Sequence, residues 1–316
     1  MSLISPLSRI PEPGSGLVKE KYTVTSGTKA NPVEIDLWRI ATCSAKDSLE
    51  PQPGAVWVPG GAMLVLDIDM ETADMASISD YFTAKLGTEP LDRDGRGYVL
   101  LYVAYRAGRP FPAPPCDVLA AYQYACAHAE ELGIIPDSIP IIGCSAGANL
   151  AWAATHMVLD LVAQNPEDRL LRAPPGFMCI YPMLDPYTDW EDTEGGIEQA
   201  TADRLRRGWR SYLKFDNLAE EDQKYLKYAK LLELSVEDLG KLVMPMHIDY
   251  GTRDYFAQEI RGAITLLNNA GVAVRLVVLD DVGHGFEIST FKNDPEHPAW
   301  RLACEERRYF LRSLLP

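Results

Sequence analysis

Residues 138–157 read SIPIIGCSAGANLAWAATHM, a short apolar run followed by a glycine-rich turn and an alanine-rich helical pattern. The turn over residues 143–147, GCSAG, matches Gly-x-Ser-x-Gly. The pattern alone is weak, but between a predicted strand and a predicted helix it is typical of a nucleophile elbow, which lifts a serine hydroxyl above a sheet. The two glycines leave room for strand and helix to approach each other. We therefore predict that Ser145 is a nucleophile, with an ordinary glycine-rich turn as the alternative.

Outward from the elbow, strand-like runs alternate with helical ones, which is typical of a mostly parallel sheet with helices on both faces. We expect strands at residues 21–25, 33–42, 55–58, 98–104, 140–143, 176–181, 244–250 and 272–279. We expect helices near residues 75–85, 117–132, 146–165, 255–269 and 297–315. Asp117 and Asp254 stand where two of these helices begin, and Gly133 and Gly271 where two end, as helix capping favours.

One segment, residues 186–241, predicts helices and no strand. Such an insertion suggests a helical cap over the edge where the parallel strands end, which is where open α/β sheets bind ligands. Its aromatic side chains could line an apolar pocket or simply pack in a core. They are Trp190, Trp209, Tyr212, Phe215, Tyr225 and Tyr228.

The charge balance excludes some partners. Thirty Lys and Arg stand against 45 Asp and Glu, a formal net charge of −15. Nucleic acid and an anionic membrane surface would repel such a chain, so neither is expected as a partner, although solubility alone also explains the charge.

No stretch approaches the roughly 18 apolar residues of a membrane helix, and the N-terminus does not read as a signal peptide. Six scattered cysteines without metal-ligand spacing predict reduced thiols, a cytoplasmic location and no metal or cofactor.

A serine hydroxyl needs a base to take its proton, and the chain has five histidines. Four of them lie within predicted helices, within a predicted strand or near the start of a helix: His128, His156, His247 and His297. The fifth, His284, lies on a loop after a strand and between two glycines, which suits a loop that presents an imidazole. We predict that His284 is the base, with a solvated loop histidine as the alternative.

An acid should orient this imidazole. The loop after strand 244–250 reads GTRD and ends in Asp254, which we predict to be that acid. A plain helix cap is the alternative role for Asp254, and Asp249, Asp280 and Asp281 are the alternative acids. The chain order serine, aspartate, histidine is that of α/β-hydrolases and differs from the orders in chymotrypsin and subtilisin.

The oxyanion formed on acyl attack needs backbone N–H donors. Strand 55–58 runs into PGGA, residues 59–62. We predict that Gly60 and Gly61 present their amides there, together with the amide of Ala146 after the nucleophile. A plain turn is the alternative for this glycine pair.

Together these motifs resemble the hormone-sensitive-lipase-like branch of the α/β-hydrolases, a family of esterases and lipases. Over roughly residue 55 to the C-terminus, the segments similar to family motifs are VWVPGGA (56–62), YRAGRPFPAPPCDVLAAY (105–122), GCSAGANLA (143–151), YPMLD (181–185), GTRD (251–254) and GHGF (283–286). The resemblance implies one α/β-hydrolase domain over residues 1–316. It also implies a triad of Ser145, Asp254 and His284, and a cap built from residues 186–241 with part of residues 1–20.

Several positions depart from the family pattern. Pro59 stands where the family has His, and Ala62 where it has the last Gly of its HGGG loop. Cys144 replaces the usual acidic residue before the nucleophile. The YRAGRP segment is shorter than its family counterpart and lacks the glutamate.

We expect a serine carboxylesterase that cleaves a small or medium neutral ester through an acyl-enzyme. Trp209, Phe286 and Met183 are the expected substrate-binding residues. One alternative uses the same scaffold for acyl transfer, elimination or cyclisation of a specialised metabolite. A non-catalytic ligand binder is less favoured because all three triad positions are filled. The edge strand 272–279 could pair two copies into a homodimer.

Overall fold

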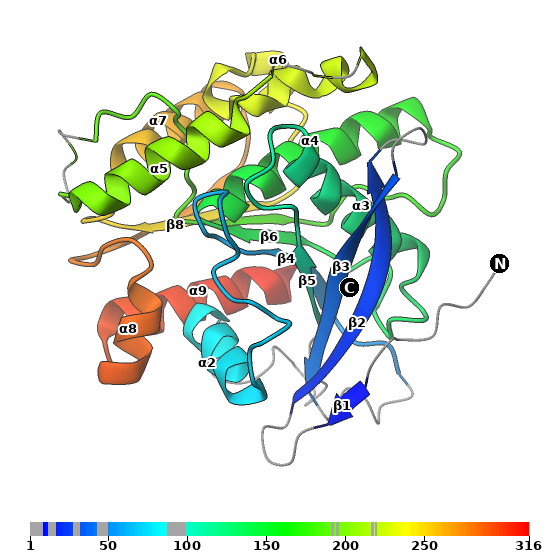
Figure 1. Cartoon of the computed structure of the whole chain (residues 1–316), viewed down its shortest axis with the longest axis horizontal. Helices are drawn as coiled ribbons and strands as arrows, with labels where there is room; N and C mark the ends of the chain where they lie inside the picture. Colours follow the sequence, from blue (N-terminus) through cyan, green and yellow to red (C-terminus); the bar gives the residue numbers. More distant parts are fainter. Residues whose placement is uncertain are drawn as a thin grey trace.

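A twisted sheet runs through the molecule and carries helices on both faces (Figure 1). The computed structural model describes residues 9–11, 17–27, 32–42, 50–86, 99–190, 193, 196–215, 218 and 220–315. Across the sheet the strands of these ranges follow the order β1-β2-β3-β5-β4-β6-β7-β8-β9. They are β1 (Arg9–Pro11), β2 (Leu17–Gly27), β3 (Pro32–Thr42), β4 (Gly54–Val58), β5 (Val99–Ala104), β6 (Ile141–Cys144), β7 (Phe177–Ile180), β8 (Met246–Gly251) and β9 (Val274–Leu279).

Strands β5, β4, β6, β7, β8 and β9 are parallel, and β1, β2 and β3 form an antiparallel extension that joins through β5. The prediction of a mostly parallel sheet is confirmed. Every residue of β4, β6, β7 and β8 is buried, as expected for strands covered on both faces. The outermost strand, β9, leaves Leu276 and Val278 partly exposed.

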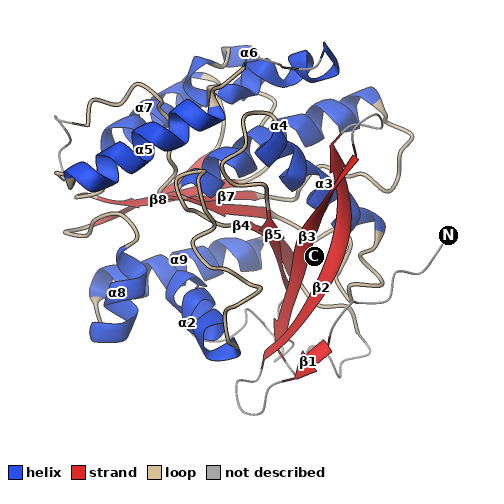
Figure 2. Cartoon of the chain, in the orientation of Figure 1, coloured by secondary structure: helices blue, strands red, loops and turns tan. Residues whose placement is uncertain are grey.

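The helices form a layer on each face of the sheet, as Figure 2 shows. On one face lie α2 (Met75–Leu86), α8 (Phe286–Asn293) and α9 (Pro298–Ser313). On the other lie α3 (Ala113–Ala127), α4 (Ala146–Gln164), α5 (Gln199–Tyr212), α6 (Val236–Leu239) and α7 (Ala257–Asn269). Helix α8 was not among the predicted helices. None of the helices in the described ranges is both long and apolar enough to span a bilayer.

The start of α3 differs from the prediction. The helix begins at Ala113 and holds Pro114 and Pro115 in its first turn, where proline is tolerated because the first N–H groups have no helical acceptor. Asp117, predicted to cap this helix, lies inside it and is fully buried. Its carboxylate pairs with Arg106, whose Nη2 lies 2.7 Å from Oδ1. The assignment of Asp117 as a cap was therefore wrong.

The regular elements in the described residues of the inserted segment are all helices: α5 is followed by the 3₁₀ helices η1 (Glu220–Ala229) and η2 (Leu231–Glu233) and by α6. Helix α5 crosses the loop that follows β4. A Cβ on Gly208 of α5 would come 2.1 Å from the carbonyl oxygen of Ala62 in that loop. Farther along, the Ser211 hydroxyl donates to the Gly108 carbonyl at 2.8 Å, and the Phe111 amide donates to the Tyr212 carbonyl at 2.8 Å.

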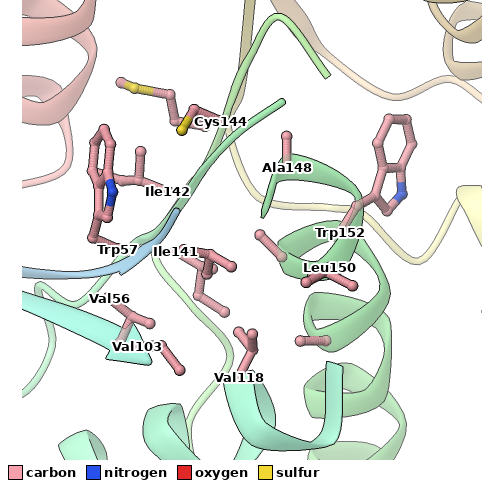
Figure 3. Close-up of a cluster of buried hydrophobic side chains, with 14 of the residues drawn as sticks. Val56, Trp57, Val103, Val118, Ile141, Ile142, Cys144, Ala148, Leu150 and Trp152 are labelled. Atoms are coloured by element: carbon pink, nitrogen blue, oxygen red, sulfur yellow. The ribbon is translucent and has the colours of Figure 1, made fainter. Parts of the chain in front are cut away.

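The core at the centre of the sheet is drawn in Figure 3. Trp57 and Cys144 lie on the side of the sheet away from α4, whereas Ala148 and Trp152 belong to α4 on the opposite side. Trp57 is fully buried and packs edge-on against Phe82 of α2, with ring centroids 5.4 Å apart. The two helical layers are thus joined through side chains that alternate across β4 and β6.

A buried histidine joins the inserted segment to α4. The His156 ring stacks on the Tyr228 ring of η1, with centroids 5.0 Å apart and planes 7° apart. Its Nε2 accepts a hydrogen bond from Trp152 Nε1 at 3.1 Å, whereas its Nδ1 has no partner among the described residues. Burial lowers the pKa of His156 to about 4.

Acid is expected to destabilise the fold through His156. The unfolded chain takes up a proton on this histidine near its ordinary pKa of about 6.5, but the folded chain does so only near pH 4. Stability from this group is therefore lost as the pH falls across that window, by up to about 3 kcal/mol. Urea unfolding between pH 7 and pH 4 measures it. His156→Gln keeps an acceptor but cannot titrate, so its unfolding free energy should fall less than that of the wild type. The exposed His128→Gln variant is the control, and equal slopes in all three proteins would contradict the assignment.

Candidate active site

The turn between β6 and α4 holds Ser145 in an uncommon backbone conformation, with φ 53° and ψ −125°. Such a φ is rare for a residue with a Cβ and is kept only where the surroundings enforce it. Two glycines beside this turn allow the backbones of β4, β6 and α4 to approach closely. A Cβ on Gly147 would lie 2.2 Å from the Val58 carbonyl oxygen, and one on Gly143 would lie 2.5 Å from the carbonyl oxygen of Gly147. Helix α4 therefore starts in direct contact with the end of β4.

The structure brings the three predicted catalytic side chains together. Nε2 of His284 lies 2.9 Å from Oγ of Ser145, and its Nδ1 lies 3.0 Å from Oδ2 of Asp254. The Asp254 side chain is fully buried and also accepts a hydrogen bond from the Phe256 amide at 2.8 Å. With Nδ1 donating to Asp254, Nε2 is left to accept the serine proton.

The alternative acids are engaged elsewhere. Asp249 is paired with Arg307, and Asp281 forms an exposed ion pair with Arg253 at 2.5 Å. Asp280 accepts a hydrogen bond from Thr252 at 3.5 Å.

Three aromatic rings enclose the imidazole of His284. The ring centroids of Tyr181, Tyr255 and Phe256 lie 4.6, 4.7 and 4.8 Å from that of His284. Only 13% of the His284 side chain is exposed. The proton path between serine and histidine is therefore shielded from most of the surrounding water.

The loop after β4 lies beside the serine. A Cβ on Gly60 would be 3.2 Å from Cβ of Ser145, so this residue borders the hydroxyl directly. Gly61 has φ +121°, and a Cβ there would lie 2.0 Å from the Val65 carbonyl oxygen. The Tyr105 hydroxyl donates to the carbonyl of Pro59 at 3.2 Å and holds the loop in place. The predicted oxyanion donors are the backbone amides of Gly60, Gly61 and Ala146. Among the described residues, none of these amides donates to a backbone carbonyl in a turn or loop.

The three predicted substrate-binding residues occupy different surroundings. Met183 is fully buried, and its amide donates to the Ser145 carbonyl at 3.2 Å. Trp209 of α5 is buried against Tyr212, with ring centroids 5.9 Å apart. Phe286 lies at the start of α8 and packs in a small separate core that includes Trp300.

A network of buried charges beneath the site was missed by sequence reasoning. Arg307 of α9 is fully buried and binds Asp249 of β8 through two nitrogens, at 2.8 and 2.6 Å. It also donates to Glu287 of α8 at 2.8 Å and to the Lys85 carbonyl of α2 at 2.7 Å. The Lys85 ammonium lies 3.7 Å from Glu287 and donates to the hydroxyl of Tyr181.

This network balances its own charge, since two cations face two carboxylates. Burial opposes the ionisation of Asp249, but the charge and hydrogen bonds of Arg307 outweigh it and lower the pKa of Asp249 to about 2. His247 Nε2 lies 2.9 Å from the same carboxylate.

No group of three or more His, Cys, Asp and Glu suited to a metal ion occurs among the described residues. In those residues Cys116, Cys126, Cys144, Cys179 and Cys304 are free thiols, whereas Cys43 lies outside them.

A serine elbow at the end of a parallel strand, with a histidine and an aspartate on the following loops, defines a protein of the α/β-hydrolase class. The profile of the α/β-hydrolase fold matches residues 94–288, more than half of the chain. The chain therefore belongs to the α/β-hydrolase family, and the predicted membership of its hormone-sensitive-lipase-like branch is confirmed.

Solved esterase structures share this fold. Carboxyl esterase 2 of Tuber melanosporum is 18% identical with a TM-score of 0.70, over 98% of this chain and 90% of that one. A thermostable esterase of Pseudomonas putida ECU1011 is 20% identical with a TM-score of 0.69, over 96% and 84%. A bacterial heroin esterase is 23% identical with a TM-score of 0.67, over 95% and 85%. None of the curated protein sequences matches this chain.

Gly147→Ala is expected to cost about 3 kcal/mol of unfolding free energy, because the new methyl group would overlap the end of β4 and overpacking is destabilising. Gly262→Ala is the matched control. Gly262 lies within α7, where a Cβ would meet nothing within 4 Å, so alanine there should add about 1 kcal/mol of stability through its helix propensity. Urea unfolding measures both, and a Gly147→Ala variant as stable as the wild type would contradict the crowding.

Arg307→Met is expected to lower the unfolding free energy by about 3–5 kcal/mol, because buried Asp249 loses its guanidinium and buried Glu287 keeps only Lys85 as a cation. Adding Asp249→Asn to this variant should restore part of the loss by removing the uncompensated charge, while Glu287 keeps its ion pair with Lys85. The control is Arg301→Met, whose ion pair with Glu296 is exposed and should contribute less than about 1 kcal/mol. Thermal and urea unfolding measure all three variants, and no recovery in the Arg307→Met, Asp249→Asn double variant would argue against unpaired charge as the cause.

Proposed function

We propose that this chain is a serine carboxylesterase, in which Ser145 is the nucleophile, His284 the general base and Asp254 the residue that orients the histidine. The observation that carries the proposal is the continuous hydrogen-bonded arrangement from Ser145 Oγ through His284 to Asp254, at 2.9 and 3.0 Å. A hydroxyl at this distance can pass its proton to the imidazole as it attacks a carbonyl carbon.

The reaction would proceed in two halves. Ser145 Oγ bonds to the ester carbonyl carbon while His284 takes its proton, and the collapse of this intermediate expels the alcohol, which receives that proton. Water then attacks the acyl-enzyme with His284 again acting as base, and the carboxylic acid leaves as the serine regains its proton. Asp254 stabilises the imidazolium in both halves without taking the proton itself.

The negative oxygen of each intermediate would be bound by backbone amides. We assign this role to Gly60, Gly61 and Ala146, because Gly60 borders Ser145 and Ala146 begins α4. The start of α4 adds the positive end of the helix dipole. Losing one such donor typically costs roughly 3 kcal/mol of transition-state stabilisation.

The surroundings of the serine favour a small or medium ester. Ser145 is 8% exposed, and α5 packs on the loop that holds Gly60 and Gly61. We therefore assign residues 186–241 as a cap over the site. We assign Trp209 and Met183 as apolar contacts of the substrate, and Phe286 as a residue at the border of the substrate site. A cytoplasmic location and pairing of two copies through β9 stay as predictions.

Ser145→Ala is expected to lower kcat/KM for p-nitrophenyl acetate by a factor of about 10⁴ or more, because the variant lacks the hydroxyl that lies 2.9 Å from His284 Nε2. Ser313→Ala, at the end of α9, is the matched control and should keep wild-type activity. A fluorophosphonate should label the wild-type chain on Ser145 and leave the Ser145→Ala variant unlabelled. Ester hydrolysis that persists in Ser145→Ala would contradict the proposed mechanism. Labelling of Ser145 without hydrolysis of any short-chain ester would instead favour acyl transfer or another reaction on this scaffold.

A further inference from the structure

A second carboxylate, that of Asp67 on the loop after β4, lies across Gly60 from Ser145. The point that a Cβ on Gly60 would occupy lies 3.2 Å from Oδ2 of Asp67 and equally 3.2 Å from Cβ of Ser145. Asp67 itself is exposed to solvent. Asp67 is thus exposed as a residue, while its carboxylate oxygens contact the buried side chains of Tyr81 and Cys144 next to the loop that borders the serine.

Neutral donors hold this carboxylate in place. The hydroxyl of Tyr81, a buried residue of α2, lies 3.0 and 2.9 Å from the two carboxylate oxygens, and Trp57 Nε1 donates to that hydroxyl at 3.3 Å. Sγ of Cys144 lies 3.6 Å from Oδ2. Burial raises the pKa of Cys144 to about 12, so the thiol keeps its proton as a donor. These groups orient the Asp67 carboxylate without cancelling its charge.

In the described ranges no cation of the protein pairs with Asp67. The ammonium of Lys85 bonds to Tyr181 and Glu287 and acts on Asp67 only through space: burial opposes the charged form of Lys85, but the charges of Glu287 and then Asp67 are among those that raise its pKa. The ammonium of Lys19 donates to the backbone carbonyls of Met70 and Ala73. The charge of Asp67 is therefore available to a group that enters with the substrate.

We propose that Asp67 selects esters that carry an ammonium group, an inference that rests on the proposed hydrolase function. A substrate cation near the carboxylate gains Coulomb attraction that a neutral group of the same shape lacks, which corresponds to about tenfold at a partly solvated site. The cation also offsets the repulsion between Asp67 and the oxyanion that forms beside Gly60. The net charge of −15 raises the local concentration of cations around the molecule.

The test compares two acetates of nearly the same shape, acetylcholine and 3,3-dimethylbutyl acetate, which differ by a quaternary nitrogen in place of a carbon. The wild type should show a kcat/KM about tenfold higher for acetylcholine at low salt, and the ratio should shrink at high salt because ions screen the attraction. In Asp67→Asn the ratio should fall to about one.

Asp69→Asn is the matched control for this test. Its carboxylate lies on the same loop but accepts from Thr72 at 2.8 Å, so this variant should keep the wild-type ratio. Equal rates for the two acetates in a wild-type enzyme that cleaves p-nitrophenyl acetate would overturn the proposal. So would an Asp67→Asn variant that loses the same factor on both, since that loss would indicate only a role in holding the loop. Failure of the hydrolase function itself is recognised separately, by absent fluorophosphonate labelling of Ser145.

Discussion

The buried guanidinium of Arg307 fixes the parts of the chain that carry the candidate site. It binds Asp249 on β8, the strand that leads to Asp254, and Glu287 on α8, the helix that begins two residues after His284. It also binds the backbone of Lys85, whose ammonium contacts Tyr181 beside the imidazole. One planar cation thus ties together the segments that lead to Asp254 and follow His284. Because the guanidinium bonds in a fixed fork, lysine in its place could not hold the same segments together.

The carboxylates near the site differ in whether a cation or only neutral donors lie beside them. Asp249 and Glu287 face buried cations, and Asp254 faces His284. Among the described residues, buried Glu259 accepts hydrogen bonds from the amides of Leu184 and Asp185 and from the Thr188 hydroxyl. Burial raises the pKa of Glu259 to about 8. Asp67 also has neutral donors but reaches solvent. Burial without a cation favours the protonated form of a carboxylate, as the raised pKa of Glu259 indicates, whereas Asp67 is exposed to solvent.

The sequence allowed much of this site to be found because the elbow and its partner loops are encoded locally. Ser145 lies between two glycines that have no room for a side chain, and His284 follows a strand on a glycine-flanked loop. The buried network could not be found in this way. Arg307 falls on the same helical stripe as Trp300, Cys304 and Leu311, which indicates burial but not a partner. Its acidic partners lie 20 and 58 residues away, and no local pattern relates them. The predicted start of α3 is too late because Pro114 and Pro115, which stand in its first turn, are equally compatible with a loop.

The presence of a cysteine before Ser145 has a physical explanation. An acidic side chain at position 144, as in the family that this chain resembles, would stand where Sγ of Cys144 lies 3.6 Å from the Asp67 carboxylate. Two carboxylates at that separation repel, and one of them would take up a proton. The thiol instead keeps its own proton, so it adds no second negative charge beside Asp67. Cys144 and Asp67 therefore act together, since the neutral residue in the elbow is what lets a single negative charge persist beside the serine.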